Sequence, residues 1–352
     1  MKNKILGALI GAAAGDAMAS ATDGRSYGEI LEVYGAEVRD FIKPVAGSQA
    51  SGREAGQFTD AFSIPLFLVN EILNEEGRMN TAIGKAALKK WGQTEYFTRF
   101  AGMTTKKVVN ELNAAETNDL WAFSGHLGSK LFKGHYYALS SNGAACKAFV
   151  PGLFNPGNRS GAIRDCVELT MASHDDPLSI SGACAVSAAV AACFEKDSTI
   201  FSVVSAAVDG SVEGEKAGHA RDDVWDYPGP STTRRLGLAQ QVALKNAGSD
   251  KAASELRDII GCGPEVAETV PLSFGLLIAR KNKPLEAIYD AVNIGDETCA
   301  AAVVTGALTG ALYGPEVFPE NWKEIVERQN EVDLTSLANG IIKYAAESGT
   351  KV

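Results

Sequence analysis

Two short acidic segments, far apart in the chain, carry the side chains best suited to chemistry. The first covers residues 56–62, Gly-Gln-Phe-Thr-Asp-Ala-Phe, and includes Asp60. The second covers residues 293–300, Asn-Ile-Gly-Asp-Glu-Thr-Cys-Ala, and includes Glu297. Both lie beside apolar, helix-forming sequence, where a carboxylate is costly to bury. Two carboxylates that share a site differ in pKa, so one can act as an acid and the other as a base.

Helical periodicity dominates the segments that must position these residues. Apolar residues recur at three- and four-residue spacing, and alternating strand patterns are nearly absent. Helices are predicted at residues 64–76, 81–91, 104–115, 179–195, 199–208, 232–247, 251–260, 285–292, 298–312, 322–328 and 334–346. Residues 21–56 and 211–231 are predicted to be irregular, and no linker or internal repeat divides the chain. The sequence therefore predicts one all-α, multi-helix domain over residues 1–352.

Composition argues against several classes of partner. The 352 residues include 33 Lys and Arg against 43 Asp and Glu, a net charge of -10, without a basic stripe. We therefore expect no nucleic-acid partner. No run of about 18 apolar residues predicts a membrane span. The six cysteines form no Cys-x-x-Cys pair, which favours a reduced, cytoplasmic compartment.

The N-terminal segment imitates a secretory signal, with two lysines before an apolar stretch and small residues after it. Asp16 interrupts that pattern, and glycines recur at every fourth position, as on a tightly packed helix face. We therefore predict a retained helix. Glycines with the same spacing recur near the C-terminus, so Gly7, Gly11 and Gly15 are expected to lie against Gly306, Gly310 and Gly314.

Several segments resemble, in the same order, the signatures of the ADP-ribosylglycohydrolase family. They are residues 7–17 (Gly-Ala-Leu-Ile-Gly to Gly-Asp-Ala), 56–60, 141–151 (Ser-Asn-Gly-Ala-Ala-Cys-Lys to Pro), 172–177 (Ala-Ser-His-Asp-Asp-Pro) and 293–310. The resemblance implies an all-α, single-domain hydrolase that removes ADP-ribose from protein side chains or related acceptors. It also implies two divalent cations, usually magnesium, held by oxygen atoms of the two acidic segments, because hard cations favour oxygen ligands.

The first acidic segment departs from the family pattern Thr-Asp-Asp-Thr. Thr59 and Asp60 match its first two positions. Ala61 replaces the second Asp, and Phe62 replaces the final Thr. Two of the oxygen ligands that the resemblance implies are therefore missing from this segment.

The second acidic segment departs from the pattern Asn-x-Gly-Gly-Asp-x-Asp-Thr. With the register fixed by Asn293 and Gly306, Glu297 stands for the first Asp, while Cys299 and Ala300 replace the second Asp and the Thr. A cysteine is too soft a ligand for magnesium. Asp296 takes the place of Glu297 only if the turn slips by one residue.

The oxygen donors that remain are Thr59, Asp60 and Glu297. They are too few to hold two magnesium ions, so we predict that a binuclear magnesium site is absent. One magnesium ion, held by these three residues and by water, is the alternative.

Acid–base chemistry is the activity that these carboxylates predict. Cleavage of a ribosyl bond passes through an oxocarbenium-like state, which a carboxylate can stabilise or supply with an activated water. The candidate catalytic residues are Asp60, Glu297 and Asp23, of which Asp23 takes the place of a family Glu in the first loop. The candidate substrate-binding residues are Thr59, Asn142, Gly143, His174 and Lys147. Lys147 stands where the family has Arg, which is the better bidentate partner for an anion.

Structural roles compete with these assignments. Asp60 with Thr59 is compatible with a helix N-cap, and Glu297 suits the first turn of another helix. A lone histidine such as His174 before a helix is more often structural than functional. The pair Asn142–Gly143 is equally compatible with a plain turn.

The sequence thus predicts a hydrolase that cleaves the N- or O-glycosidic bond of an ADP-ribose-like or nucleoside-like substrate, with reduced or no dependence on a binuclear metal. The alternative is a non-catalytic descendant of the family that binds such a ligand or a protein partner. A small molecule or an ADP-ribosylated substrate is the expected partner. The oligomeric state stays open.

Overall fold

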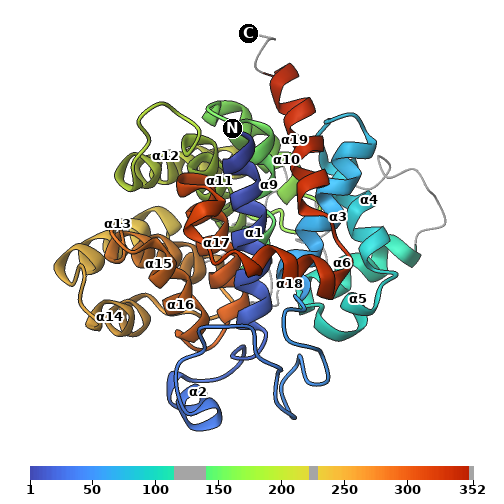
Figure 1. The fold of residues 1–352 in the computed structure, drawn as a ribbon. Helices are drawn as coiled ribbons and strands as arrows, with labels where there is room; N and C mark the ends of the chain where they lie inside the picture. Colours follow the sequence, from blue (N-terminus) through green and yellow to red (C-terminus); the bar gives the residue numbers. More distant parts are fainter. Residues whose placement is uncertain (115–139, 222–228, 349–352) are drawn as a thin grey trace.

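The computed structural model describes residues 1–114, 140–221 and 229–348, which form an all-α fold (Figure 1). Within these ranges, β pairing is limited to two isolated bridges, Arg25 with Asp296 and Ser141 with Glu265. The predicted all-α class is confirmed. None of the described helices is both long enough and apolar enough to cross a membrane.

The helices follow one another without a sheet between them. Their bounds are α1 Lys2–Ala19, α2 Tyr27–Tyr34, α3 Asp60–Asn74, α4 Thr81–Trp91, α5 Glu95–Phe100, α6 Met103–Ala114, α8 Gly143–Cys146, α9 Phe149–Phe154, α10 Arg159–Thr170, α11 Pro177–Ala192, α12 Ile200–His219, α13 Thr232–Lys245, α14 Lys251–Ile260, α15 Val266–Ala279, α16 Pro284–Asn293, α17 Thr298–Tyr313, α18 Asn321–Asn330 and α19 Leu334–Ser348. A short 3₁₀ helix, η1 Pro315–Val317, separates α17 from α18.

Helices α1 and α17 pack side by side at the centre of the molecule (Figure 1). They meet through glycines, as the sequence predicts. A Cβ atom on Gly11 would lie 2.2 Å from the Gly306 carbonyl oxygen, and one on Gly310 would lie 2.0 Å from the Gly7 carbonyl oxygen. Small residues at these positions therefore allow backbone-to-backbone contact. Gly314 also lies beside Gly7, but Gly15 differs from the prediction, because it faces Ala302 rather than a glycine.

A second central pair is formed by α11 and α12. Every residue of α11 is buried, as its Ala- and Val-rich sequence predicts. Its first turn is capped by Asp176, whose side chain accepts a hydrogen bond from Ser179 N at 3.0 Å. Most remaining helices pack around these two central pairs.

Two segments predicted to be irregular contain helices. Residues 21–56 include α2, which begins with a capping box formed by Ser26 and Glu29. Residues 211–219 continue α12, because Gly214 and Gly218 pack closely against Cys184 and Pro177 of α11. Glycine in this stretch serves helix packing rather than a loop. Helices α5, α8, α9, α10 and α15 are also absent from the sequence prediction.

Candidate active site

The ends of several helices meet around one acidic cavity. Its volume is about 300 Å³. The loop after α1 contributes Asp23, the start of α3 contributes Asp60, and the residue before α17 contributes Glu297. Further polar side chains in the wall are Gln49, Thr104, Thr105, Ser141 and Asn142, and apolar ones include Ile64, Phe100 and Met103. Asp60 and Glu297, 237 positions apart in sequence, therefore share a cavity as expected.

The buried carboxylate of Asp16, in α1, fixes the start of α3. Its Oδ2 accepts hydrogen bonds from Thr59 N at 2.8 Å and Phe62 N at 2.9 Å, and its Oδ1 accepts one from Thr59 Oγ1 at 2.7 Å. Thr59 also caps α3, because its hydroxyl oxygen accepts a hydrogen bond from Ala61 N at 3.3 Å. Asp60 is the first residue of the helix that these contacts position.

Replacing Asp16 with Ala tests this support. The three hydrogen bonds are worth roughly 1–2 kcal/mol each, and about half of that is recovered because a buried charge is removed. We expect Asp16→Ala to lower the free energy of unfolding by about 2 kcal/mol and Asp16→Asn to lower it by less. Urea denaturation at pH 7 measures both changes. An alanine variant as stable as the wild type contradicts the role assigned to Asp16.

A short antiparallel contact brings Asp23 to Glu297. Gly24 N donates to Asp296 O at 2.9 Å, and Asp296 N donates to Arg25 O at 2.7 Å. The side chain of Asp23 then reaches the start of α17, where its Oδ1 accepts a hydrogen bond from Cys299 N at 3.0 Å. A carboxylate at this position also suits the positive end of the helix dipole.

Glu297, rather than Asp296, lines the cavity, which is the register set by Asn293. Glu297 Oε2 accepts a hydrogen bond from Asn142 Nδ2 at 3.3 Å. Asp296 is exposed, has a φ of 62°, and lies on the wall of a different surface pocket beside Gly263. The two neighbouring carboxylates therefore face different environments.

The three cavity carboxylates have raised pKa values. Burial raises the pKa of Asp23 to about 6, partly offset by hydrogen bonds at the start of α17. Burial, with the neighbouring charges of Asp16, Asp23 and Glu297, holds the pKa of Asp60 well above its ordinary range. Burial and the charge of Asp23 raise the pKa of Glu297 to about 7. The cavity is thus able to hold both protonated and ionised carboxyl groups at neutral pH.

Asn142 and Gly143 also line the cavity, at the start of α8. Their segment is held against the start of α15: Asn142 N donates to Pro264 O at 2.7 Å, and Val266 N donates to Ser140 O at 2.8 Å. The pair is therefore a fixed part of the wall. Its amide group is turned to Glu297, which positions that carboxylate.

The other predicted substrate-binding residues lie behind the wall. Thr59, His174 and Lys147 are 4%, 1% and 5% exposed, and none of them lines the cavity. His174 instead contacts Ser141, and Lys147 contacts Ser173. Direct contact with a substrate would require these side chains to move. The sequence interpretation missed Ser141, although it directly precedes the Asn142–Gly143 pair.

The wall of the cavity lacks several of the oxygen donors that two divalent cations would need. Ala61, Cys299 and Ala300 occupy wall positions where the family resemblance implies oxygen ligands. The Thr59 hydroxyl is engaged by Asp16 and Ala61 N. Among the described residues, no group of three or more His, Cys, Asp or Glu side chains is arranged to hold a metal ion. One cation on Thr59, Asp60 and Glu297 stays a prediction.

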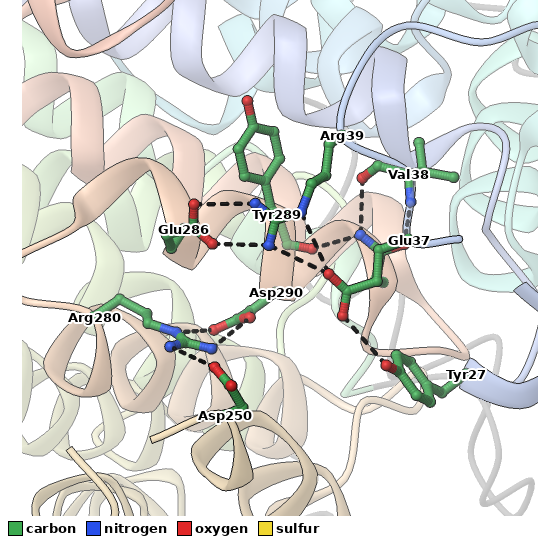
Figure 2. A network of polar contacts seen from close by, with 10 residues as sticks. Tyr27, Glu37, Val38, Arg39, Asp250, Arg280, Glu286, Tyr289 and Asp290 are labelled. Atoms are coloured by element: carbon green, nitrogen blue, oxygen red, sulfur yellow. Dashed lines mark hydrogen bonds and ion pairs between the residues drawn. The ribbon is translucent and has the colours of Figure 1, made fainter. Parts of the chain in front are cut away.

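A second cavity, of about 500 Å³, lies near the segment that leads to Glu297 but differs in character. Its arginines are paired with acids (Figure 2): Arg280 binds Asp290 at 2.6 Å, and Arg39 binds Glu286 at 2.9 Å. Asn293 joins this region to the chain after α2, accepting a hydrogen bond from Val38 N at 2.7 Å. Paired charges favour a structural role, so we take the acidic cavity as the candidate active site.

Comparisons with known proteins agree with this architecture. A solved structure described as an ADP-ribosylglycohydrolase-related protein complex matches with a TM-score of 0.66 and 18% identity, covering 98% of each chain. The Escherichia coli K12 protein YegU, itself uncharacterized, is 24% identical over 97% of both chains. The ADP-ribosylarginine hydrolase Tri1 of Serratia proteamaculans is 23% identical over 98% of this chain and 80% of its own.

The family model described as ADP-ribosylglycohydrolase matches residues 1–350, nearly the whole chain. That match includes every element that contributes to the acidic cavity, from α1 to α17. A glycohydrolase type of function follows at the level of the superfamily. The chain therefore belongs to the ADP-ribosylglycohydrolase family.

Proposed function

We propose that the protein hydrolyses an N-glycosidic bond of a ribosyl compound, with Asp60 and Glu297 as its acid and base and without a binuclear metal site. The observation that supports this most directly is the gathering of Asp23, Asp60 and Glu297 in one cavity. Their half-buried, mutually repelling carboxyl groups are costly to maintain. A purely structural descendant of the family gains nothing from keeping them.

The roles follow from the contacts of each carboxyl group. Protonated Asp60 donates its proton to the leaving nitrogen as the C–N bond breaks. Ionised Glu297, held by Asn142, takes a proton from the water whose oxygen attacks the anomeric carbon. Asp23, held by the start of α17, stays near the ribose and stabilises the positive charge of the oxocarbenium-like state.

The charge of the wall favours a neutral or cationic leaving group. The described residues that line the cavity include three acids and no Arg, Lys or His. A nucleoside base or the guanidinium group of an ADP-ribosylated arginine meets this condition. The second compound is the type of substrate named for the Serratia relative. A pyrophosphate placed against these acids would be repelled.

A hydrolysis screen tests the proposal. ADP-ribosylated arginine peptide, ADP-ribose and adenosine are incubated with enzyme of measured metal content, with and without EDTA. We expect turnover of at least one N-glycoside and little loss on chelation. Loss of all activity with EDTA, restored by magnesium, contradicts the metal-independent assignment and supports the single-cation alternative.

Glu297→Gln and Asp296→Asn form a matched pair of variants for the same reaction. Glu297→Gln removes the base and is expected to lower kcat by about 100-fold to 10,000-fold. Asp296→Asn removes the adjacent but outward-facing carboxylate and keeps kcat within about twofold, since Asn tolerates its positive φ. Equal losses in the two variants contradict the assignment of Glu297.

The pH profile of kcat/KM has a predicted form. The rate rises with pH as Glu297 ionises, around pH 7, because its pKa is raised to about 7. The rate falls at higher pH as Asp60, whose pKa is held well above its ordinary range, loses its proton. In Glu297→Gln the rising limb disappears. A wild-type rate independent of pH between 5 and 9 contradicts the acid–base assignment.

Non-catalytic binding is the second candidate, favoured by the loss of oxygen ligands at Ala61, Cys299 and Ala300. It predicts that adenosine or ADP-ribose raises the melting temperature in proportion to the logarithm of its concentration, without any product. Turnover in the screen rejects this candidate. A cytoplasmic location stays a prediction from the sequence.

A further inference from the structure

A buried series of hydrogen bonds leads from Lys147 to the wall of the acidic cavity. Lys147 Nζ donates to Ser173 Oγ. Ser173 Oγ lies 2.8 Å from His174 Nδ1, and His174 Nε2 lies 2.7 Å from Ser141 Oγ. Lys147, Ser173 and His174 are all buried, whereas Ser141 lines the cavity. The series therefore has a cation at one end and a substrate-accessible hydroxyl at the other.

The donors and acceptors favour one direction for this series. An ammonium group only donates, so Ser173 Oγ accepts from Lys147 and is free to donate its own proton to His174 Nδ1. His174 then carries its proton on Nε2 and donates to Ser141 Oγ. In the reverse direction Ser173 would accept from both neighbours. In the described part of the chain, Lys147 and His174 are the side chains that form hydrogen bonds with Ser173 Oγ. If both donated to it, the hydroxyl proton of Ser173 would be buried without an acceptor.

We infer that Ser141 binds substrate by donating a hydrogen bond into the acidic cavity, and that Lys147, acting through Ser173 and His174, is the positioning residue that directs this proton. The inference rests on the proposed function, because the Ser141 hydroxyl supplies the proposed active site with a neutral hydrogen-bond donor. With His174 Nε2 donating to Ser141 Oγ, the Ser141 proton turns away from the imidazole and toward the cavity.

The protonation states agree with this arrangement. Burial and the charge of Lys147 hold the pKa of His174 well below its ordinary range, so the ring is neutral and has one N–H group. Burial lowers the pKa of Lys147 only to about 8, so most molecules carry the ammonium at pH 7. A neutral imidazole between Ser173 and Ser141 transmits a single hydrogen-bond direction.

The substrate group that fits Ser141 is a neutral acceptor, such as a ribose hydroxyl or a carbonyl oxygen of a base. The carboxylates of Asp23, Asp60 and Glu297 are acceptors when ionised, and the amide of Asn142 already donates to Glu297. Ser141 is thus a donor that is not committed to a carboxylate. Lys147 strengthens it by polarisation while its own charge stays behind the wall.

The tautomer of His174 tests the direction of the hydrogen bonds from Lys147 to Ser141, and the test needs no substrate. Nitrogen-15 NMR of the full-length protein at pH 7 reports which ring nitrogen carries the proton. The signal among the four histidines is assigned by its loss in His174→Asn. We expect a neutral ring protonated on Nε2, and a shift toward the Nδ1 tautomer in Lys147→Met. A wild-type ring protonated on Nδ1, or on both nitrogens, overturns the inference whether or not the protein is an enzyme.

A double-mutant cycle tests the link to substrate, using whichever of adenosine, ADP-ribose or ADP-ribosylated arginine peptide is turned over. We expect Ser141→Ala and Lys147→Met each to lower kcat/KM by about tenfold or more, and Lys147→Met to have less than about a twofold effect once Ser141 is Ala. Lys147→Arg retains most activity. Independent, multiplicative losses overturn the inference.

Two further variants separate this role from general stability. Lys85→Met removes another buried lysine, on α4 and outside the lining of the cavity, and is expected to leave kcat/KM unchanged. If Lys147→Met does not fold, Ser173→Ala interrupts the same series at its middle, with Ser187→Ala on α11 as its buried-serine control. A Ser173→Ala enzyme with wild-type kcat/KM and an unchanged His174 tautomer also overturns the inference.

Discussion

Asp60→Asn is expected to abolish turnover and, at the same time, to raise the melting temperature. The variant keeps the size and shape of the side chain but loses its exchangeable acid proton. As the proposed acid, Asp60 supplies a proton to the leaving group, so kcat is expected to fall by at least about 1,000-fold. Activity and stability then move in opposite directions, which is the behaviour of a strained functional group.

The gain in stability follows from the charges around Asp60. Asp16, Asp23 and Glu297 all repel its ionised form, and burial penalises it further. The opposing term is the favourable contact of a carboxylate with the first turn of α3, worth roughly 0.5 kcal/mol. Repulsion and burial outweigh that contact, because they shift the pKa of Asp60 far upward. We expect the melting temperature to rise by at least about 2 °C.

The pH dependence of stability provides a second test of the Asp60→Asn variant. A carboxyl group whose pKa is raised on folding binds more protons in the native state, so stability falls as pH rises from its unfolded to its folded pKa. With Asp16 and Asp23 at about 6 and Glu297 at about 7, the wild type loses stability between about pH 4 and pH 7. The advantage of Asp60→Asn should grow across this window.

Calorimetric scans at pH 5, 6, 7 and 8, with the turnover assay at each pH, measure both effects. Asp40→Asn, an exposed replacement away from the cavity, controls for the change in net charge. If Asp60→Asn is less stable than the wild type at pH 8, the carboxyl group is stabilised by a contact other than those described, such as a bound cation. Calorimetry with added magnesium then tests that explanation.

Much of the fold could be predicted because the local signals agree with tertiary packing. Helix α4 begins after Asn80, which caps it, and α14 covers the predicted residues 251–260. The glycine spacing in α1 and α17 predicts their contact. Prediction failed where glycine serves helix packing, as in the second half of α12, and where Pro271 lies inside α15.

The site was only partly predictable, because sequence order does not show which side chains meet in space. The family resemblance placed Asp60 and Glu297 in one cavity and set the register at Asn293. The contact between Ser141 and His174 joins two separate segments, so no local pattern indicates it. The burial of His174 behind the wall, rather than in it, likewise depends on how α8 and α11 pack.

Gly310→Ala is expected to be among the most destabilising single-methyl additions in this chain. The new Cβ would lie 2.0 Å from the Gly7 carbonyl oxygen and 2.1 Å from the Gly7 carbonyl carbon, and both are backbone atoms of a buried helix. Neither can move without shifting α1 as a whole. We expect the free energy of unfolding to fall by at least about 3 kcal/mol, near the upper part of the range for overpacking.

Gly237→Ala is the matched control, because it makes the same change inside α13, where a Cβ meets nothing within 4 Å. There, alanine removes backbone freedom from the unfolded chain and is expected to stabilise by about 0.5–1 kcal/mol. The same chemical change thus has opposite signs at two helical positions. Urea denaturation of both variants measures the contrast, and equal effects would contradict the backbone contact between α1 and α17.

That contact also holds the acidic cavity together, because α1 carries Asp16 and leads to Asp23, while α17 follows directly on Glu297. Any Gly310→Ala protein that still folds should therefore lose activity as well as stability.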